Sequence, residues 1–375
     1  RLGEQVISWG ESTFIGNSLN EINTVDVTKI RAPGVEVKDA LLPNMAAYLS
    51  WQSISGLSIE AFYLFDFDEV QLDAAGTFWN TLPSVADGGL TLGPLARTAD
   101  EYGSDSGQYG IALRYFAAGL GNGVELGAYY MKLHSHNPVL SGVAGGQYFL
   151  EYPEDREIWG LSYNTIFGSW ASSGEWSHRR NEPLQVSDFF NAALGLGDGV
   201  GGLPNMTPNF TAVDPVGTVY HGYDRVQFDQ VQNTFQRTIT PHFIGGDTMG
   251  ILIEAAYTWV DDEPATLTPL HRLDDDAWGY RVRVNVTYNR AIAQVINLTP
   301  EINWRHDVNG VAGPFIEDAK TLALSLNWDY LVNLSGGFSI THNFDGSRHK
   351  NTLSGAPTRG DEDRSWFTAN IKYEF

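Results

Sequence analysis

The sequence predicts an all-β protein, a transmembrane antiparallel up-and-down β-barrel with about 14 strands. Three observations support this: strand-length segments alternate in polarity, short and long links alternate along the chain, and aromatic residues and glycine are abundant. The 375 residues include 40 Gly, 17 Tyr, 19 Phe and 11 Trp, which suit strands, tight turns and aromatic girdles. No run of 18 or more apolar residues occurs, so the sequence excludes a transmembrane helix.

The final segment, residues 365–375, shows the alternation most clearly. Its polar side chains fall on one face, and the other face carries Phe367, Ala369, Ile371, Tyr373 and Phe375. This pattern is typical of a strand between lipid and water. The terminal Phe375 resembles the signal that the barrel-assembly machinery reads, so we expect that machinery and outer-membrane lipids as partners.

Alternation and turn residues together locate the expected strands, with boundaries uncertain by ~2–4 residues. The predicted strands are 1–9, 45–53, 56–68, 107–118, 123–134, 156–167, 169–180, 225–243, 248–260, 277–290, 294–306, 319–332, 334–345 and 364–375. In the strand at 277–290, Val282, Val284 and Val286 alternate with Arg281 and Arg283. An Arg on the lipid face at the midplane costs roughly 2–4 kcal/mol, so the valines are expected outside and the arginines inside.

Short and long connections alternate without exception. The short links fall near 53–55, 119–123, 168, 245–247, 291–293 and 332–333, and the long ones at 10–44, 69–106, 135–155, 181–224, 261–276, 307–318 and 346–363. Short periplasmic turns and long extracellular loops are typical of transmembrane barrels. We therefore expect residues 1–375 to form a single barrel domain that fourteen strands can close. The chain opens directly on a strand, so we also expect a preceding segment and 16–18 strands in the full-length protein.

Charged residues of both signs fall on the expected lumen faces: Arg114, Glu125, Glu157, Glu175, Arg179, Glu254, Arg281, Arg283, Glu301 and Arg305. Two interpretations remain open. Cross-strand pairs can stiffen the wall, or the charges can contact a permeating solute. Under the second interpretation, Arg114 or Arg283 is expected to engage an acidic head group.

Apolar side chains also occupy inward positions, namely Phe62, Leu64, Phe116, Tyr129 and Met131. An aqueous pore does not need them, so they either line a path for a partly apolar ligand or pack under a loop folded into the lumen. The 10–44 segment is the expected loop, because a long loop with its own apolar residues usually packs on something. Its expected constriction residues are Trp9, Glu11, Asp26 and Arg31.

Composition and motifs argue against several other functions. A net charge of −22 argues against nucleic-acid binding, which needs a basic surface. The absence of cysteine excludes disulfides and thiolate metal sites. His134, His136, His178 and His342 lack a neighbouring nucleophile or a metal-ligand spacing, so we expect no enzyme, metal or cofactor. The acidic loops are expected to serve solubility, or alternatively to bind divalent cations that bridge to anionic lipid.

Residues 1–67 carry a series of ordered motifs. They include Arg1-x-Gly3-x-Gln5-Val6-x-Ser8-Trp9-Gly10-Glu11, Ile22-Asn23-x-Val25-Asp26-Val27, Arg31-x-Pro33-Gly34-x-Glu36 and Leu57-Ser58-x-Glu60-Ala61-Phe62-Tyr63. In these motifs the chain resembles the proteobacterial "domain of unknown function 1302" family. The resemblance implies a barrel in the outer membrane of a Gram-negative bacterium, with a segment of several strands before the first motif. It also implies a resistance-nodulation-division-type permease and a lipoprotein as partners.

The inward apolar residues favour transport of a hydrophobic or amphipathic small molecule, and the family resemblance implies transport of such molecules or of lipids as part of an envelope-spanning system. Two alternatives stay open. One is a water-filled diffusion porin for small polar solutes, and the other is a closed scaffold for an envelope complex.

Overall fold

One large antiparallel sheet dominates the computed structural model, which describes residues 1–30, 40–53, 55–78, 80, 84–86, 88–92, 94–185, 215–241, 243–261, 274–344 and 365–374. The sheet has 14 strands in chain order. They are β1 (Leu2–Gln5), β2 (Asn44–Gln52), β3 (Leu57–Leu64), β6 (Tyr109–Ala117), β7 (Val124–Leu133), β10 (Arg156–Phe167), β11 (Trp170–Gln185), β13 (Tyr223–Ile239), β14 (Thr248–Asp261), β15 (Asp276–Ile292), β16 (Ile296–Asn309), β17 (Lys320–Tyr330), β18 (Leu334–Asn343) and β19 (Trp366–Tyr373). Each of the fourteen predicted strands is present, so the predicted fold class is confirmed.

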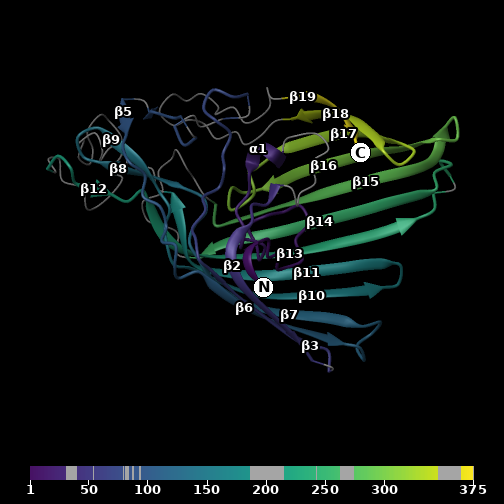
Figure 1. The fold of residues 1–375 in the computed structure, drawn as a ribbon, viewed down its shortest axis with the longest axis horizontal. Helices are drawn as coiled ribbons and strands as arrows, with labels where there is room; N and C mark the ends of the chain where they lie inside the picture. The colour runs from purple at the N-terminus through teal and green to yellow at the C-terminus, as the bar shows by residue number, and fades with distance from the viewer. Residues whose placement is uncertain are drawn as a thin grey trace.

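The sheet curves into a barrel wall, with its short turns at one end and its long connections at the other (Figure 1). The β2–β3, β10–β11 and β17–β18 turns lie at the same end as the C-terminus (Figure 1), as the alternation of link lengths predicted. β1 and β19 form the two edges of the sheet. No backbone pairing joins these edges among the residues described.

The outward face of the wall is apolar along continuous rows. Cross-strand partners share a face, and one such row runs through Ile251, Val284, Ile302, Leu324, Ile340 and Phe367. Ile302, Ile340 and Phe367 are 50%, 58% and 61% exposed. An apolar surface of this extent on a sheet is suited to lipid contact. In contrast, Glu254, Arg281, Arg305 and Thr321 form a polar row on the inward face.

A second, five-stranded sheet lies at the long-connection end (Figure 1). Its strands are β12 (Val219–Tyr220), β8 (Val139–Val143), β9 (Gln147–Glu151), β5 (Leu95–Arg97) and β4 (Thr91–Leu92). Leu95 and Tyr148 form its core, with Leu92 and Leu140 packed against them. This sheet could not be predicted from the sequence, because strands of two to five residues from separate connections have no detectable periodicity.

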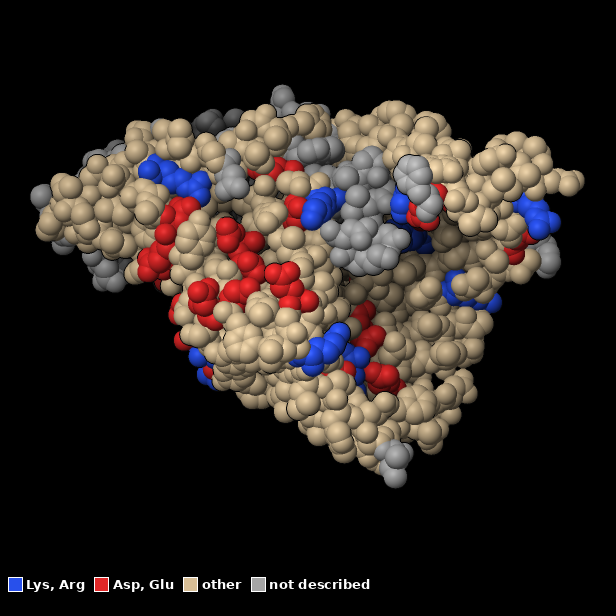
Figure 2. Space-filling model, viewed as in Figure 1, with Lys and Arg blue, Asp and Glu red and all other residues tan. Residues whose placement is uncertain are grey.

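The N-terminal part of the chain crosses the concave side of the sheet in front of β10, β11 and β13 (Figure 1). After it comes the short helix α1 (Val27–Ile30). Within the described ranges, the structure contains no helix of the length and apolarity that crossing a membrane requires. Figure 2 shows acidic side chains gathered toward the long-connection end and others within the hollow of the concave side.

Candidate functional site

Residues 6–24, which we call the luminal segment, lie against inward-facing side chains of the wall. Five of their apolar residues are almost fully buried: Ile7, Trp9, Ile15, Leu19 and Ile22 are 0–3% exposed. The wall residues that hold the segment come mainly from β10, β11, β13 and β14. The segment therefore fills part of the lumen, at the position proposed for a constriction.

Glu254, on β14, holds the middle of the luminal segment. Its carboxylate is 0% exposed and accepts three backbone N–H groups, from Thr13 (2.8 Å), Phe14 (2.6 Å) and Ile15 (2.7 Å). The hydroxyl of Thr234, on neighbouring β13, donates to the same carboxylate at 3.0 Å. Hydrogen bonds to a charged acceptor are stronger than neutral ones, so this single carboxylate fixes a whole turn of the segment.

Glu175, on β11, holds the segment on either side of that turn. It accepts the backbone N–H of Glu11 and, at 3.3 Å, that of Leu19. Gly10 allows this approach, because a Cβ there would lie 2.6 Å from the Glu175 carboxylate. Gly10 also has φ +90°, a conformation that L side chains rarely adopt.

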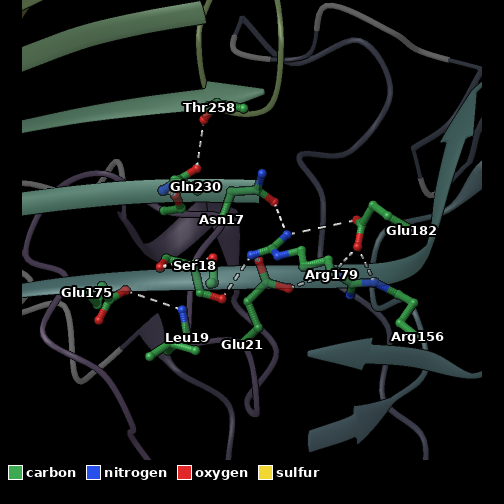
Figure 3. A network of polar contacts seen from close by, with 12 residues as sticks. Asn17, Ser18, Leu19, Glu21, Arg156, Glu175, Arg179, Glu182, Gln230 and Thr258 are labelled. Atoms are coloured by element: carbon green, nitrogen blue, oxygen red, sulfur yellow. Dashed lines mark hydrogen bonds and ion pairs between the residues drawn. The ribbon is translucent and has the colours of Figure 1, made fainter. Parts of the chain in front are cut away.

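Two arginines of the wall form a buried ion network with Glu21 (Figure 3). Arg179 donates to Glu21 (2.6 Å), to the Ser18 carbonyl (2.9 Å) and to the side chain of Asn17. Arg156 pairs with Glu21 at 2.7 Å and with Glu182 at 2.8 Å. Burial alone would raise the pKa of Glu21, but Arg179 and Arg156 outweigh it and lower that pKa to about 2. Glu21 is therefore ionised at neutral pH.

Four of the five predicted inward apolar residues pack under the luminal segment. Trp9 lies edge-on to Phe62 at a ring-centroid distance of 5.0 Å and lies 5.9 Å from Tyr129. Leu64 and Met131 belong to the same buried cluster, together with Leu19 and Ile22 of the segment. Of the two interpretations of these residues, the geometry corresponds to packing beneath a folded loop. A path along them exists only if Trp9 moves.

Phe116 lies apart from this cluster. It is 50% exposed and lines an open cavity of about 270 Å³ together with Ser50, Gln52, Gly56, Ser58, Glu60, Arg114 and Glu125. Arg114 lies between Glu60 (4.0 Å) and Glu125 (3.6 Å). Glu60 also accepts the indole N–H of Trp9 at 2.8 Å, so one carboxylate joins the cavity to the luminal segment.

The remaining predicted lumen arginines are held by carboxylates. Arg281 and Arg305 both pair with Asp307, at 2.7 Å and 2.6 Å. Arg283 pairs with Glu301 at 3.5 Å and lies over the ring of Phe14 at 4.9 Å. The Arg281–Asp307 and Arg283–Glu301 pairs couple β15 to β16, whereas Arg305 and Asp307 lie on the same strand, and Arg283 also contacts the luminal segment.

The predicted constriction residues are only partly brought together. Trp9 and Glu11 lie inside the wall, where the Asn164 side chain donates to Glu11 at 3.0 Å. Asp26 instead holds the start of α1, accepting the Thr28 N–H at 3.0 Å. Arg31 and Phe375 lie outside the described residues.

The lumen assignment of Glu157 is wrong. It alternates with the buried Ile158 and shares its face with Trp159 and Leu161, which are 45% and 54% exposed on the outward side. Glu157 pairs in register with Lys132 and Arg180 near the end of β10. At a strand end a charge can lie on the outward face, because it extends beyond the hydrocarbon layer.

The structure assigns roles that sequence reasoning missed. Glu175, Arg179 and Glu254 were expected to pair across strands or contact a solute, but they bind the luminal segment. Asn17 and Glu21 were not singled out. Their sequence signal is weak, since their partners Arg156 and Arg179 lie more than 130 positions away in the sequence.

His134, Glu154 and Asp155 bring possible metal-ligand atoms within 4.8 Å of one another. Both ring nitrogens of His134 are already used: Nε2 bonds the Ser106 carbonyl at 2.9 Å, and Nδ1 accepts the Asp155 N–H at 3.2 Å. The ring therefore serves the loop structure and offers no free ligand atom.

Comparison with known proteins identifies the family. The sequence matches the family described as "Protein of unknown function (DUF1302)" over residues 1–375. The chain belongs to this family. A search of curated proteins gives no match.

Solved structures give distant likenesses. The outer-membrane protein OmpT of Vibrio cholerae is 13% identical, with a TM-score of 0.37 over 88% of this chain and 89% of that one. A mutant of the ferric enterobactin receptor PfeA of Pseudomonas aeruginosa is 12% identical, with a TM-score of 0.40 over 81% of this chain and 50% of that one. Likenesses at this level carry no information about substrate.

Proposed function

We propose that this protein is an outer-membrane barrel that transports an amphipathic or hydrophobic small molecule, and that the luminal segment is its gate. The outward apolar rows support a location in a membrane. The inward wall combines ion pairs with the aromatic residues Phe62 and Tyr129, which suits a ligand with both a polar and an apolar part.

One observation carries the proposal. The luminal segment lies between β1 and β2 in the chain but forms no strand of the large sheet. It is attached to the wall chiefly by side chains of the wall, above all Glu175 and Glu254. Such contacts can be exchanged for water or ligand one at a time, without breaking the hydrogen-bond ladder of the sheet. Release of the segment would expose Phe62 and Tyr129 and open the lumen.

The test is solute flux into proteoliposomes, with the flux into empty liposomes subtracted. Hexylphosphocholine, an amphiphile that crosses a protein-free lipid bilayer slowly, is compared with sucrose. We expect hexylphosphocholine to enter faster than sucrose, and Glu254→Gln, which loosens the segment, to increase its flux several-fold. Equal entry of both solutes would instead indicate a diffusion porin. No entry of either, even with Glu254→Gln, would indicate a closed scaffold.

The expected permease and lipoprotein partners remain predictions within this proposal. An envelope-spanning system would deliver the solute to, or take it from, the periplasmic mouth of the barrel, at the short-turn end. The open cavity beside Gly56 and Phe116 lies next to the β2–β3 and β6–β7 turns at that end.

A further inference from the structure

The cavity lined by Arg114 and Phe116 carries an excess of negative charge. Glu60 and Glu125 flank the single guanidinium of Arg114. A third carboxylate, Glu11, enters from the luminal segment and is held by Asn164, the register partner of Glu125 on β10. Among the residues that line the cavity, two carboxylates and one arginine give a formal charge of −1, and Glu11 adds a third carboxylate that interacts electrostatically with Arg114.

The Arg114 guanidinium is poorly placed to bind an anion. It already has Glu60 and Glu125 within 4.0 Å, and it lies 5.7 Å from the Tyr129 ring centroid. An acidic head group that approached it would also meet the carboxylates, and like charges repel. This differs from the sequence-based expectation that Arg114 engages an acidic head group.

Glu125 and Phe116 offer the complementary surface. The Glu125 side chain is 43% exposed, and Phe116, its register partner on β6, is 50% exposed and faces the same cavity. A positive group beside Glu125 would lie next to an apolar aromatic surface that can take an alkyl chain. The hydroxyls of Ser50 and Ser58 and the amide of Gln52 line the rest of the cavity and can hydrate the head group.

We propose that this cavity binds the organic ammonium group of a cationic or zwitterionic amphiphile, with Glu125 as the main charge partner and Phe116 contacting the chain. The proposal rests on the function proposed above and specifies its ligand class. Because Glu60 also holds Trp9, an ammonium group that draws Glu60 toward itself competes with the Trp9 indole. Ligand binding would thereby weaken one attachment of the luminal segment.

The test uses two probes with the same chain and permanent opposite charges, hexyltrimethylammonium and hexyl sulfate. Binding to the full chain in lipid nanodiscs is measured by isothermal titration calorimetry, with empty nanodiscs subtracted. We expect the ammonium probe to bind about tenfold more tightly than the sulfate. Glu125→Gln should remove most of that preference, while Glu301→Gln, which alters an inward carboxylate–arginine pair outside the cavity lining, should leave it unchanged.

Equal binding of the two probes by the wild-type protein, or a preference for hexyl sulfate, would overturn the inference. Loss of the preference in Glu301→Gln as strongly as in Glu125→Gln would also overturn it, because the selectivity would then come from the whole lumen. Flux of the same probes separates this inference from the proposed function. Flux without charge preference contradicts the ammonium site alone, whereas absence of any flux contradicts transport itself.

Discussion

At the scale of single residues, two inward carboxylates determine where the luminal segment lies. A buried carboxylate in a barrel wall is normally satisfied by an arginine on the next strand. Glu254 does have Arg281 as its register partner, but Arg281 pairs with Asp307 and the Glu254 oxygens accept backbone N–H groups of Thr13, Phe14 and Ile15. Glu254 therefore positions residues 13–15, and Glu175 positions Glu11 and Leu19 on either side of them.

The first prediction concerns Glu254. Glu254→Gln retains the size of the side chain but replaces one acceptor oxygen with an NH2 group. This group cannot accept a hydrogen bond from the backbone N–H groups of the segment. We expect the free energy of unfolding to fall by about 1–3 kcal/mol and proteolysis within residues 10–24 to accelerate. Urea unfolding in lipid vesicles and limited proteolysis measure these effects. Glu101→Gln, at an exposed position, is the control. Equal resistance of the two variants to urea and to protease would contradict the role of Glu254.

The second prediction concerns pH. The pKa of Glu21 is about 2 in the folded protein, below its ordinary value of 4.5, so its ion pairs contribute stability above pH 4.5 that is lost as the pH falls toward 2. Glu21→Gln should lower the free energy of unfolding by roughly 3 kcal/mol at pH 7. The difference from wild type should shrink steadily between pH 4.5 and pH 2. A pH-independent difference would mean that the Glu21 charge does not stabilise the segment.

At the scale of elements, the luminal segment is seated by the shape of the wall as well as by its charges. Gly160 on β10 leaves space that Leu19 fills, because a Cβ at Gly160 would lie 2.2 Å from a Leu19 methyl carbon. Similarly, a Cβ at Gly110 on β6 would lie 2.9 Å from the Trp9 ring. Glycines on the inward face therefore mark the path of the segment along the wall.

This gives a third prediction. Gly160→Ala should displace Leu19, destabilise the protein by about 1–3 kcal/mol and increase hexylphosphocholine flux. Gly119→Ala adds the same methyl group in the β6–β7 turn, where no atom lies within 4 Å, and should change neither quantity appreciably. Urea unfolding and hexylphosphocholine flux are measured on both variants, and only Gly160→Ala should change them. If Gly160→Ala lowers the stability but leaves hexylphosphocholine flux unchanged, Leu19 has no role in gating.

The strands and their links could be predicted from the sequence, whereas the lumen contents could be predicted only in outline. Strand positions follow from alternation, because lipid contact on one face and polar contact on the other repeat every second residue. The sequence predicted a luminal loop at residues 10–44, and residues 10–24 of it lie against the inward side of the wall, but their attachment could not be predicted. Asn17 and Glu21 bind wall residues more than 130 positions away, and backbone donors leave no trace in the sequence.

Each wrong or missed prediction has an identifiable physical cause. Glu157 was misplaced because face assignment by polarity fails at strand ends, where both faces meet water. Asp26 was expected in the constriction, yet a short polar side chain followed by Thr28 binds its own local backbone. The five-stranded sheet was missed because its strands pair across three separate connections.

At the scale of the whole molecule, the two faces of the barrel wall need opposite side chains, apolar on the outward face and polar on the inward face. Val284 belongs to the outward apolar row, and Asn285 beside it faces inward with Gly250 and Glu301. The fourth prediction is that Val284→Arg lowers the free energy of unfolding in lipid by roughly 2–4 kcal/mol, while Asn285→Arg has a clearly smaller effect. Heat-modifiable electrophoretic mobility and urea unfolding measure both. Equal tolerance of the two arginines would contradict the assignment of lipid and lumen faces.

The central claim is that the luminal segment closes the barrel and must move for solute to pass, and a reversible lock tests it most directly. The Ser18 and Ser177 hydroxyl oxygens lie 3.4 Å apart, both side chains are buried, and the chain contains no cysteine of its own. In the Ser18→Cys/Ser177→Cys double variant, oxidation should join the segment to β11 and abolish hexylphosphocholine flux, and reduction should restore it. Each single variant should conduct in both redox states. Undiminished flux through the fully oxidised double variant would contradict the claim.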